Sequence, residues 1–351
     1  RSRVPSPATG ITAFLMGFFN VLVASMILWT FRHKLSQRWL WRMAGLSAFF
    51  ATLMLAGSVS ASQLVDFFEQ RLYSANIIYA EQTPYQRIVL TSNGRDTRLF
   101  LNGNVQFSSI DEYRYHELLV HPAMSVPRSR ERVLVLGGGD GLVARELLKY
   151  DDVREIIIVD LDPAITQLAQ TYPILTRLNE DALSDPRVTI INTDAYRYVE
   201  EGGERFSVVI IDLPDPNNES LSKLYSETFY RLLHNRLTPD GAFITQATSP
   251  YFSRNAFWTI VTTIEAAQFP VTPLHTYVPS FGEWGFVLGT PLRPPSLSVP
   301  PDIELRYLTP DVLDAAQYFD PDITRVEGLD INTLDHPILP RVYERDWRQW
   351  N

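Results

Sequence analysis

"VLVLGGGDGLVAREL" (residues 133–147) has four glycines between an apolar run and a helical pattern. An apolar strand, a glycine-rich turn and a helix in this order are typical of the first unit of a nucleotide-binding sheet. Turns that hold phosphates rely on backbone N–H groups, yet this turn contains the carboxylate of Asp140. A pyrophosphate would be repelled there, so the turn favours a nucleoside that presents a positive charge.

Apolar strands alternate with helical patterns beyond this stretch. Each of the first four predicted strands is followed by a helical pattern or a turn. Such connections give a parallel sheet, and a parallel sheet needs helices on both of its faces. The sequence therefore predicts an α/β, Rossmann-like, doubly wound fold of the class I methyltransferase type. The further strands are expected at "EIIIVDLD" (155–162), "VTIINTDA" (188–195), "FSVVIIDLPD" (206–215), "FITQA" (243–247) and "WGFVLGT" (284–290).

The chain is expected to have four parts. Residues 1–62 form a transmembrane helical hairpin, and residues 63–110 form a connector with a small β domain. Residues 111–290 form the Rossmann-like catalytic domain. Residues 291–351 begin with the proline-rich linker "PLRPPSLSVPP" and continue as an irregular extension.

Two apolar stretches, residues 11–31 and 43–62, carry no charged residue. Each is long enough to cross a hydrocarbon core of about 30 Å as a helix, with a buried core helix as the alternative. We expect a multi-pass protein of the cell membrane that contacts lipid and continues a longer membrane region before Arg1. The connector between the two stretches is basic, which favours a cytoplasmic connector and hence a catalytic domain outside the cell. Further spans before Arg1 would allow a cytoplasmic catalytic domain instead, so both orientations stay open.

Charge and cysteine content restrict the function. The net charge is −9, and all 40 acidic residues follow residue 62. An acidic domain disfavours nucleic acid as a partner and suits a cationic ligand, although ordinary solubilising charge explains it equally well. The absence of cysteine excludes disulfides, thiol catalysis and thiolate metal sites, and no metal site is expected.

Acidic residues follow four of the predicted strands. Ligands of doubly wound sheets bind at these strand ends, although a single aspartate there is more often a helix cap. Asp160 lies 19 residues after Gly141, at a spacing suited to both ribose hydroxyls, and Asp194 with Ala195 suits an adenine. The expected nucleoside-binding set is Gly137, Gly138, Gly139, Asp160, Asp194 and Ala195. Decarboxylated S-adenosylmethionine fits Asp140 well, because it presents an ammonium without a neighbouring carboxylate.

Three motifs, "YRYHELLVHPAM" (113–124), "GGGDG" (137–141) and "DLPDP" (212–216), together resemble the polyamine aminopropyltransferases, the spermidine synthase family. The resemblance runs from about residue 77 to 290, and the preceding spans are similar to the membrane-attached bacterial branch. It implies aminopropyl transfer from decarboxylated S-adenosylmethionine, as co-substrate, to a small diamine. Putrescine would yield spermidine and methylthioadenosine, without a prosthetic group, in a homo-oligomer.

The same resemblance assigns residue roles. Asp212 would be the general base, with Tyr115 and Tyr277 as hydrogen-bonding partners. Two positions depart from the family pattern: Asp160 stands where glutamate is common, and Glu219 stands where many relatives have proline. The implied substrate-binding set is Gln86, His121, Asp140, Asp215 and Gln246.

Two alternative functions share these features. An S-adenosylmethionine-dependent methyltransferase would have the same fold and the same acid for the ribose, but Leu136 ends the first strand where such enzymes commonly carry an acid. A non-catalytic, polyamine-sensing membrane module is the third hypothesis. The presence of both Asp212 and Asp215 argues against it.

Overall fold

The computed structural model describes residues 70–350, together with positions 19–20, 23, 26, 29–30, 36–39, 41–49 and 52. None of the helices formed by these residues combines the length and apolar character needed to cross a bilayer. This finding corrects the predicted multi-pass membrane localisation. The two apolar stretches, 11–31 and 43–62, lie largely outside the described residues, as do residues 63–69 of the predicted connector.

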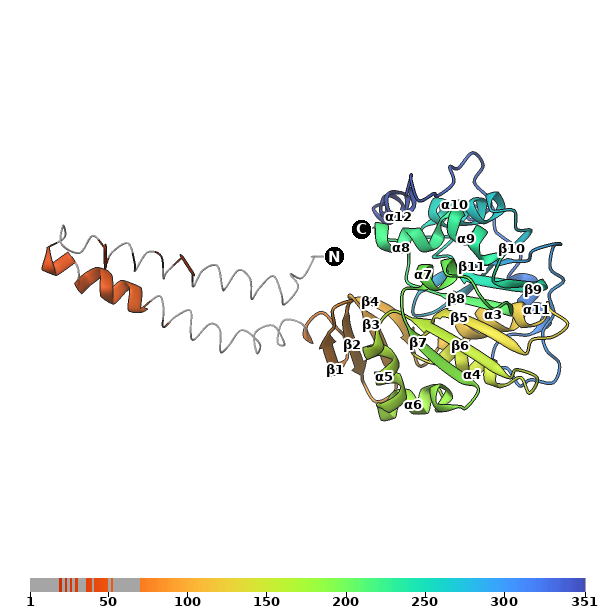
Figure 1. Cartoon of the computed structure of the whole chain (residues 1–351), viewed down its shortest axis with the longest axis horizontal. Helices are drawn as coiled ribbons and strands as arrows, with labels where there is room; N and C mark the ends of the chain where they lie inside the picture. Colours follow the sequence, from red (N-terminus) through yellow and green to blue (C-terminus); the bar gives the residue numbers. More distant parts are fainter. Residues whose placement is uncertain are drawn as a thin grey trace. The chain divides into compact units, whose positions relative to one another are not determined.

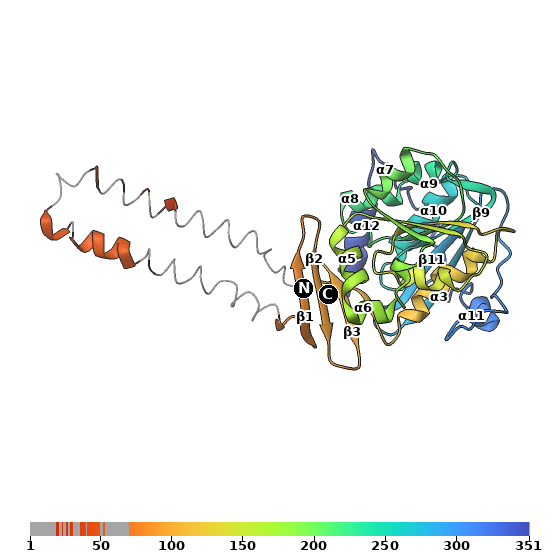
Figure 2. The same cartoon turned by 60° about the horizontal axis from the view of Figure 1, so that its bottom comes forward.

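The chain divides into two compact units, Arg1–Ile77 and Ile78–Asn351. A four-stranded sheet, which apart from its first two residues belongs to the second unit, has its strands in chain order. Asn93-Gly94 makes the turn between the second and third strands, and Asn102-Gly103, both at positive φ, makes the next. The first strand was not expected from the sequence. The strands are β1 (Asn76–Gln82), β2 (Arg87–Ser92), β3 (Thr97–Leu101) and β4 (Asn104–Ser108) (Figures 1 and 2).

A seven-stranded sheet forms the centre of this unit, with the order β10-β11-β9-β8-β5-β6-β7. The five strands from β9 to β7 in this order run parallel, and β11 and β10 are antiparallel additions at one edge. The parallel core confirms the predicted α/β class. The strands are β5 (Arg132–Gly137), β6 (Glu155–Asp160), β7 (Val188–Asn192), β8 (Phe206–Asp212), β9 (Leu237–Gln246), β10 (Val271–Val278) and β11 (Gly282–Gly289).

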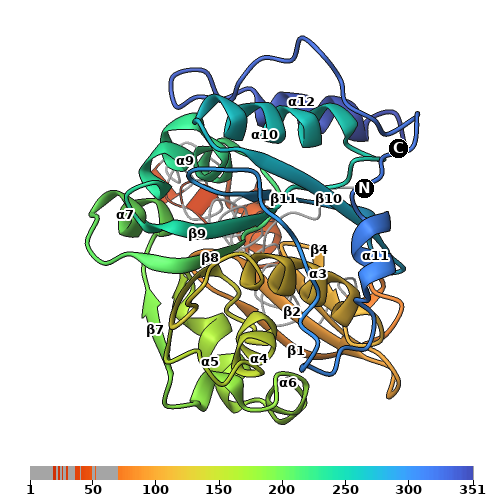
Figure 3. The ribbon, with the colours of Figure 1, turned by 90° about the vertical axis from the view of Figure 1, so that its right-hand side faces the viewer.

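Helices cover both faces of the sheet (Figure 3). Along β5, Val133 and Val135 pack with α3, α4 and α5, whereas Leu134 and Leu136 pack with α7, α9 and α10. This alternation follows from the two-residue period of a strand and divides the core into two layers. The helices are α3 (Glu112–Met124), α4 (Leu142–Leu148), α5 (Pro163–Thr171), α6 (Pro173–Leu178), α7 (Ala195–Glu200), α8 (Glu219–Ser222), α9 (Glu227–Leu233), α10 (Arg254–Ala266), α11 (Pro310–Ala315) and α12 (Leu339–Trp347).

Two regions differ from the sequence-based expectation. Strand β10 was missed because polar residues, including His275 and Thr276, interrupt its apolar pattern. The extension after residue 302 was expected to be irregular, but it contains α11 and α12. Helix α12 packs against α10, so this end of the chain is part of the folded unit.

The order of the strands reverses at β5, which lies between β6 and β8. Gly137 at the end of β5 is paired with Asp212 at the end of β8. Gly137 has a φ of +84°, and a Cβ atom there would lie 2.0 Å from the carbonyl oxygen of Asp212. Only glycine allows the two strand ends to approach this closely, at the edge where doubly wound sheets bind ligands.

We expect Gly137→Ala to lower the free energy of unfolding by about 3 kcal/mol, because strain at positive φ and a backbone clash add together. Gly94→Ala is the matched control: its φ is also +84°, and no atom lies within 4 Å of its Cβ position. That variant should lose only about 1 kcal/mol. Urea denaturation measures both losses, and equal losses would contradict the close contact with Asp212.

Candidate active site

The site begins where α3 approaches the ends of β5 and β8. The hydroxyl of Tyr115 on α3 donates a hydrogen bond to Oδ1 of Asp212 at 2.6 Å. Asp140, in the glycine turn, accepts the backbone N–H of Leu142 at 2.9 Å through Oδ1. Asp140, Asp212 and His116 lie near enough to change one another's pKa values. The structure therefore brings Tyr115, Asp140 and Asp212 together, and adds His116.

The carboxyl groups of this cluster ionise less readily than free aspartate. Burial raises the pKa of Asp212 to about 6, the charge of Asp140 acts in the same direction, and His116 with Tyr115 opposes the increase. Burial also raises the pKa of Asp140, against the effect of His116 and the hydrogen bond from Leu142. A bound cation would offset the repulsion between the two carboxylates and favour their charged forms.

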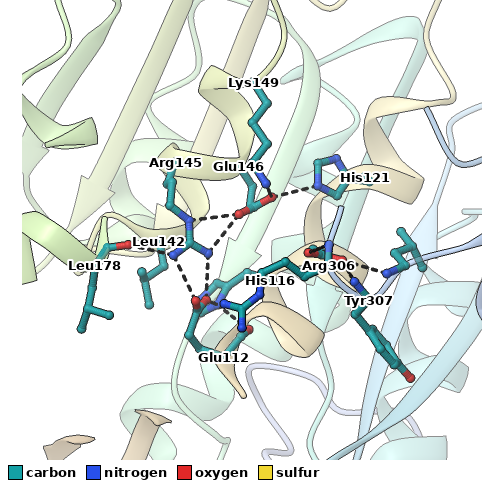
Figure 4. A network of polar contacts seen from close by, with 12 residues as sticks. Glu112, His116, His121, Leu142, Arg145, Glu146, Lys149, Leu178, Arg306 and Tyr307 are labelled. Carbon is teal, nitrogen blue, oxygen red and sulfur yellow. Dashed lines mark hydrogen bonds and ion pairs between the residues drawn. The ribbon is translucent and has the colours of Figure 1, made fainter. Parts of the chain in front are cut away.

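His116 is positively charged at neutral pH because of its neighbours. Its Nδ1 lies 2.8 Å from Oε2 of Glu112, and Arg145 donates to both oxygens of Glu112 at 3.0 and 2.9 Å (Figure 4). Burial opposes the charge, but Glu112, together with Asp140 and Asp212, raises the pKa of His116 to about 9. An imidazolium therefore lies beside the two aspartates.

His121 lies elsewhere in the same network (Figure 4). Its Nδ1 is 2.8 Å from the hydroxyl of Tyr150, and its Nε2 is 3.0 Å from Oε2 of Glu146. The ring is fully buried. The structure thus places His121 in the interior and brings His116 to the aspartates, where the sequence analysis expected His121. The position of His116 directly after Tyr115 was the sequence signal for this placement.

The predicted nucleoside-binding residues lie around the glycine turn. Oδ2 of Asp160, at the end of β6, accepts the N–H of Gly139 at 3.1 Å, and Oδ1 accepts the N–H of Asp162 at 3.0 Å. A Cβ on Gly139 would lie 2.5 Å from Oδ2 of Asp160, so this glycine lets the carboxylate reach the turn. Burial raises the pKa of Asp160 to about 6. Gln86 donates to Oδ2 of Asp162 at 3.0 Å, which links the small sheet to this edge.

Asp194 is a helix cap and an ion-pair partner. One oxygen accepts the N–H groups of Tyr196 and Arg197 at the start of α7, and the other lies 2.5 Å from Nζ of Lys223. Burial opposes ionisation, but Lys223 lowers the pKa of Asp194. Ala195, the first residue of α7, is buried. Both the cap and the binding role considered from the sequence are thus compatible with this position.

Asp215 accepts a hydrogen bond from a helix of the C-terminal extension. Its Oδ2 accepts the hydroxyl hydrogen of Tyr343 on α12 at 2.8 Å, and its Oδ1 is buried without a hydrogen bond from any described residue. Burial raises the pKa of Asp215 to about 6, and the polar side chains of Tyr343, Gln246 and Thr248 oppose the increase. Sequence reasoning missed Tyr343 because the extension was expected to be irregular.

Gln246 and Tyr277 differ in their placement. Gln246 is buried and donates to the carbonyl of Leu213 and to the hydroxyl of Tyr225, both at 2.6 Å. It therefore supports the loop that carries Asp215. Tyr277 on β10 is 55% exposed. Among the described residues, the tyrosine hydroxyl that donates to Asp212 is that of Tyr115 and not that of Tyr277. Its backbone carbonyl accepts a hydrogen bond from Arg114 of α3.

Comparisons with known proteins point to one family. The model of the spermine/spermidine synthase domain matches residues 112–292. A polyamine aminopropyltransferase of Oceanobacillus iheyensis is 43% identical over 345 residues, which cover 97% of this chain and 66% of that protein. One from Leptospira interrogans is 44% identical over 347 residues, with 98% and 69% covered. The chain spans about two thirds of the length of these relatives.

Solved structures agree with the sequence comparisons. The crystal structure of a spermidine synthase in complex with the transition-state analogue AdoDATO has a TM-score of 0.64 and 26% identity, and the match covers 70% of this chain and 85% of that chain. The spermidine synthase from Thermotoga maritima has a TM-score of 0.62 at the same identity, with 70% and 84% covered.

We expect His116 to titrate near pH 9 in an NMR titration of labelled histidine, and Glu112→Gln to lower that pKa, since a charged acceptor is removed. A folded-state pKa above the ordinary 6.5 means that His116 stabilises the fold below pH 6.5, and that this contribution disappears as the pH rises through about 9. His275, whose raised pKa depends on Glu283, is the internal control. An unchanged His116 titration in the variant would contradict the role of Glu112.

Proposed function

The chain belongs to the spermine/spermidine synthase family, and on this premise we propose that it transfers an aminopropyl group from decarboxylated S-adenosylmethionine to putrescine. The products are spermidine and methylthioadenosine, and no prosthetic group takes part. The observation that carries the proposal is the pair Asp140 and Asp212, two carboxylates with raised pKa values beside the glycine turn. Such a pair suits two cationic substrates and is unfavourable for a phosphate.

The donor occupies the edge formed by β5, β6 and β7. Gly137, Gly138 and Gly139 let the backbone approach the nucleoside, and Asp160 accepts hydrogen bonds from its ribose. Asp140 pairs with the ammonium of the aminopropyl group, which orients the carbon next to the sulfonium. The remaining proposed contacts of the nucleoside are with Gln86, Asp194 and Ala195.

The reaction is a direct displacement at this carbon. Putrescine is protonated at neutral pH, since the pKa of an alkylammonium is about 10.4, and it must lose a proton before its nitrogen can attack. Asp212, oriented by the hydroxyl of Tyr115, takes this proton as the general base. The C–N bond forms as the C–S bond breaks, and the sulfonium leaves as neutral methylthioadenosine.

The acceptor lies between Asp212 and Asp215. Asp215 binds one amine of the diamine, and Gln246 fixes the loop from which Asp215 projects. The exposed ring of Tyr277 covers the acceptor when it is bound. His121 is buried away from the aspartates and is not part of this contact; His116, whose imidazolium lies beside Asp140 and Asp212, offsets part of their negative charge.

Two broader expectations belong to the same proposal. One is the division of the chain at residues 62, 110 and 290, with the catalytic part between 111 and 290. The other is assembly into a homo-oligomer, which light scattering of the purified protein would test.

We expect Asp212→Asn to reduce turnover by at least about a hundredfold, because general base catalysis contributes roughly 10²–10⁴. Donor affinity should stay within about twofold in calorimetry with methylthioadenosine, an order-of-magnitude expectation for a group that acts on the acceptor. Asp151→Asn, at an exposed turn, is the matched control and should keep full activity. A parallel loss of nucleoside binding in the Asp212 variant would argue against the base.

Asp140→Asn should raise the KM for decarboxylated S-adenosylmethionine by about tenfold, which corresponds to one charge-assisted hydrogen bond. The variant should also discriminate less well between the two donors, because the group that repels the carboxylate of S-adenosylmethionine is removed. Competition assays with both donors measure the ratio. A methylated amine formed by the wild-type protein from S-adenosylmethionine would instead indicate a methyltransferase.

A further inference from the structure

Helix α12 contributes a side chain to the acceptor region from outside the matched family domain. The domain match ends at residue 292, whereas α12 spans Leu339–Trp347. Its Tyr343 donates a hydrogen bond to Oδ2 of Asp215 at 2.8 Å. A segment that follows the catalytic domain in sequence therefore contacts one of the two acidic residues of the DLPDP motif.

Asn332 connects the C-terminal extension to the segment that follows the DLPDP motif. This residue is fully buried, and its Nδ2 donates to the carbonyls of Ser222 and Tyr225 at 2.9 and 3.0 Å. Its Oδ1 accepts the N–H groups of Ile338 and Leu339 at 3.0 and 3.3 Å, at the start of α12. One buried amide thus connects the segment that follows the DLPDP loop to the helix that carries Tyr343.

A second anchor holds the other end of α12. Asp346 is buried and accepts hydrogen bonds from Nδ2 of Asn255 at 2.8 Å and from the N–H of Ala256 at 3.1 Å, at the start of α10. Trp347 stacks on Phe252 with ring centroids 5.5 Å apart. Because α12 is held at both ends, the position of the Tyr343 hydroxyl is set by the fold.

The two carboxylate oxygens of Asp215 have different surroundings. Oδ2 accepts the hydrogen bond from Tyr343, while Oδ1 is buried and makes no hydrogen bond with the described residues, although the side chains of Gln246 and Thr248 lie near enough to lower the pKa of the carboxyl group. A buried carboxylate oxygen without a donor is costly, and an ammonium group would satisfy it. The hydrogen bond to Oδ2 also restricts rotation of the carboxylate, so Oδ1 keeps one direction before any acceptor binds.

We propose that Tyr343 is a positioning residue for the amine acceptor: its hydroxyl orients Asp215 so that Oδ1 receives an ammonium group of the diamine. The proposal rests on the proposed function, and it assigns the C-terminal extension a part in acceptor binding. Tyr343 acts through Asp215 and takes no part in the proton transfer at Asp212.

The test is Tyr343→Phe, which removes the hydroxyl and keeps the ring. The KM for putrescine should rise about tenfold, in the range for a lost hydrogen bond to a charged group, while kcat and the KM of the donor stay within about twofold. Tyr318→Phe is the matched control, since Tyr318 lies in the same extension and is 67% exposed. That variant should behave like the wild type. A wild-type KM for putrescine in Tyr343→Phe would overturn the proposal.

A double-mutant cycle with Asp215→Asn separates positioning from a general structural effect. In the Asp215→Asn background, Tyr343→Phe should cause no further increase in the KM for putrescine. Equal effects in both backgrounds, or a joint loss of kcat, donor affinity and thermal stability, would mean that Tyr343 only holds α12 in place, and would overturn the proposal.

Calorimetry of putrescine binding to the protein saturated with methylthioadenosine distinguishes this inference from the proposed function. If the wild type forms no spermidine but binds putrescine, and Tyr343→Phe weakens that binding about tenfold, the inference stands while the proposed function fails. If spermidine is formed and the variant binds putrescine as tightly as the wild type, the proposed function stands and the inference fails.

Discussion

The site depends on the repulsion between carboxyl groups held out of water at the point where the strand order reverses. Burial raises the pKa values of Asp140, Asp160, Asp212 and Asp215 above that of free aspartate. Between about pH 4 and 6 these groups therefore bind more protons in the folded state than in the unfolded state, and their contribution to stability falls as the pH rises through this window. Ionising these groups at neutral pH works against folding, and cationic substrates at the same place offset that effect. The cost to stability and the selectivity for cations have one physical origin.

The rest of the domain holds this cluster in place from two sides. On one side, the imidazolium of His116 faces the aspartates and is backed by Glu112 and Arg145, so charges of alternating sign extend from the glycine turn into α3 and α4. On the other side, the C-terminal extension is bound to α3 through Glu117, whose buried carboxylate accepts three successive backbone N–H groups at residues 306–308. The extension then reaches Asp215 through α12. The site thus combines residues at the ends of the parallel strands with Tyr343, which follows Asp215 by 128 positions.

The parallel sheet and its acidic strand ends could be predicted from sequence because their signals are local. A buried strand is a continuous apolar run, and the glycine turn and the DLPDP motif directly follow such runs at Gly137 and Asp212. The histidine could not be chosen this way, because His116 and His121 lie on one helix and only the contacts of Glu112 and Glu146 decide which of them faces the aspartates. Tyr343 could not be found either, since its role depends on the long-range contacts of Asn332 and Asp346. The predicted membrane localisation depended on the length and hydropathy of the apolar stretches near the start, and none of the helices formed by the described residues supports it.

The most direct test of the charged site is the number of protons exchanged when an acceptor binds. Isothermal titration calorimetry of putrescine, with methylthioadenosine present, in buffers of different ionisation enthalpy gives this number at each pH. A carboxyl group with a pKa of about 6 is half protonated at pH 6, and a bound cation lowers that pKa. With two such groups at the acceptor, we expect release of about one proton at pH 6 and much less at pH 7, where both carboxyl groups are largely ionised and His116 is still charged. Binding without proton release at pH 6, or with proton uptake, would contradict the account.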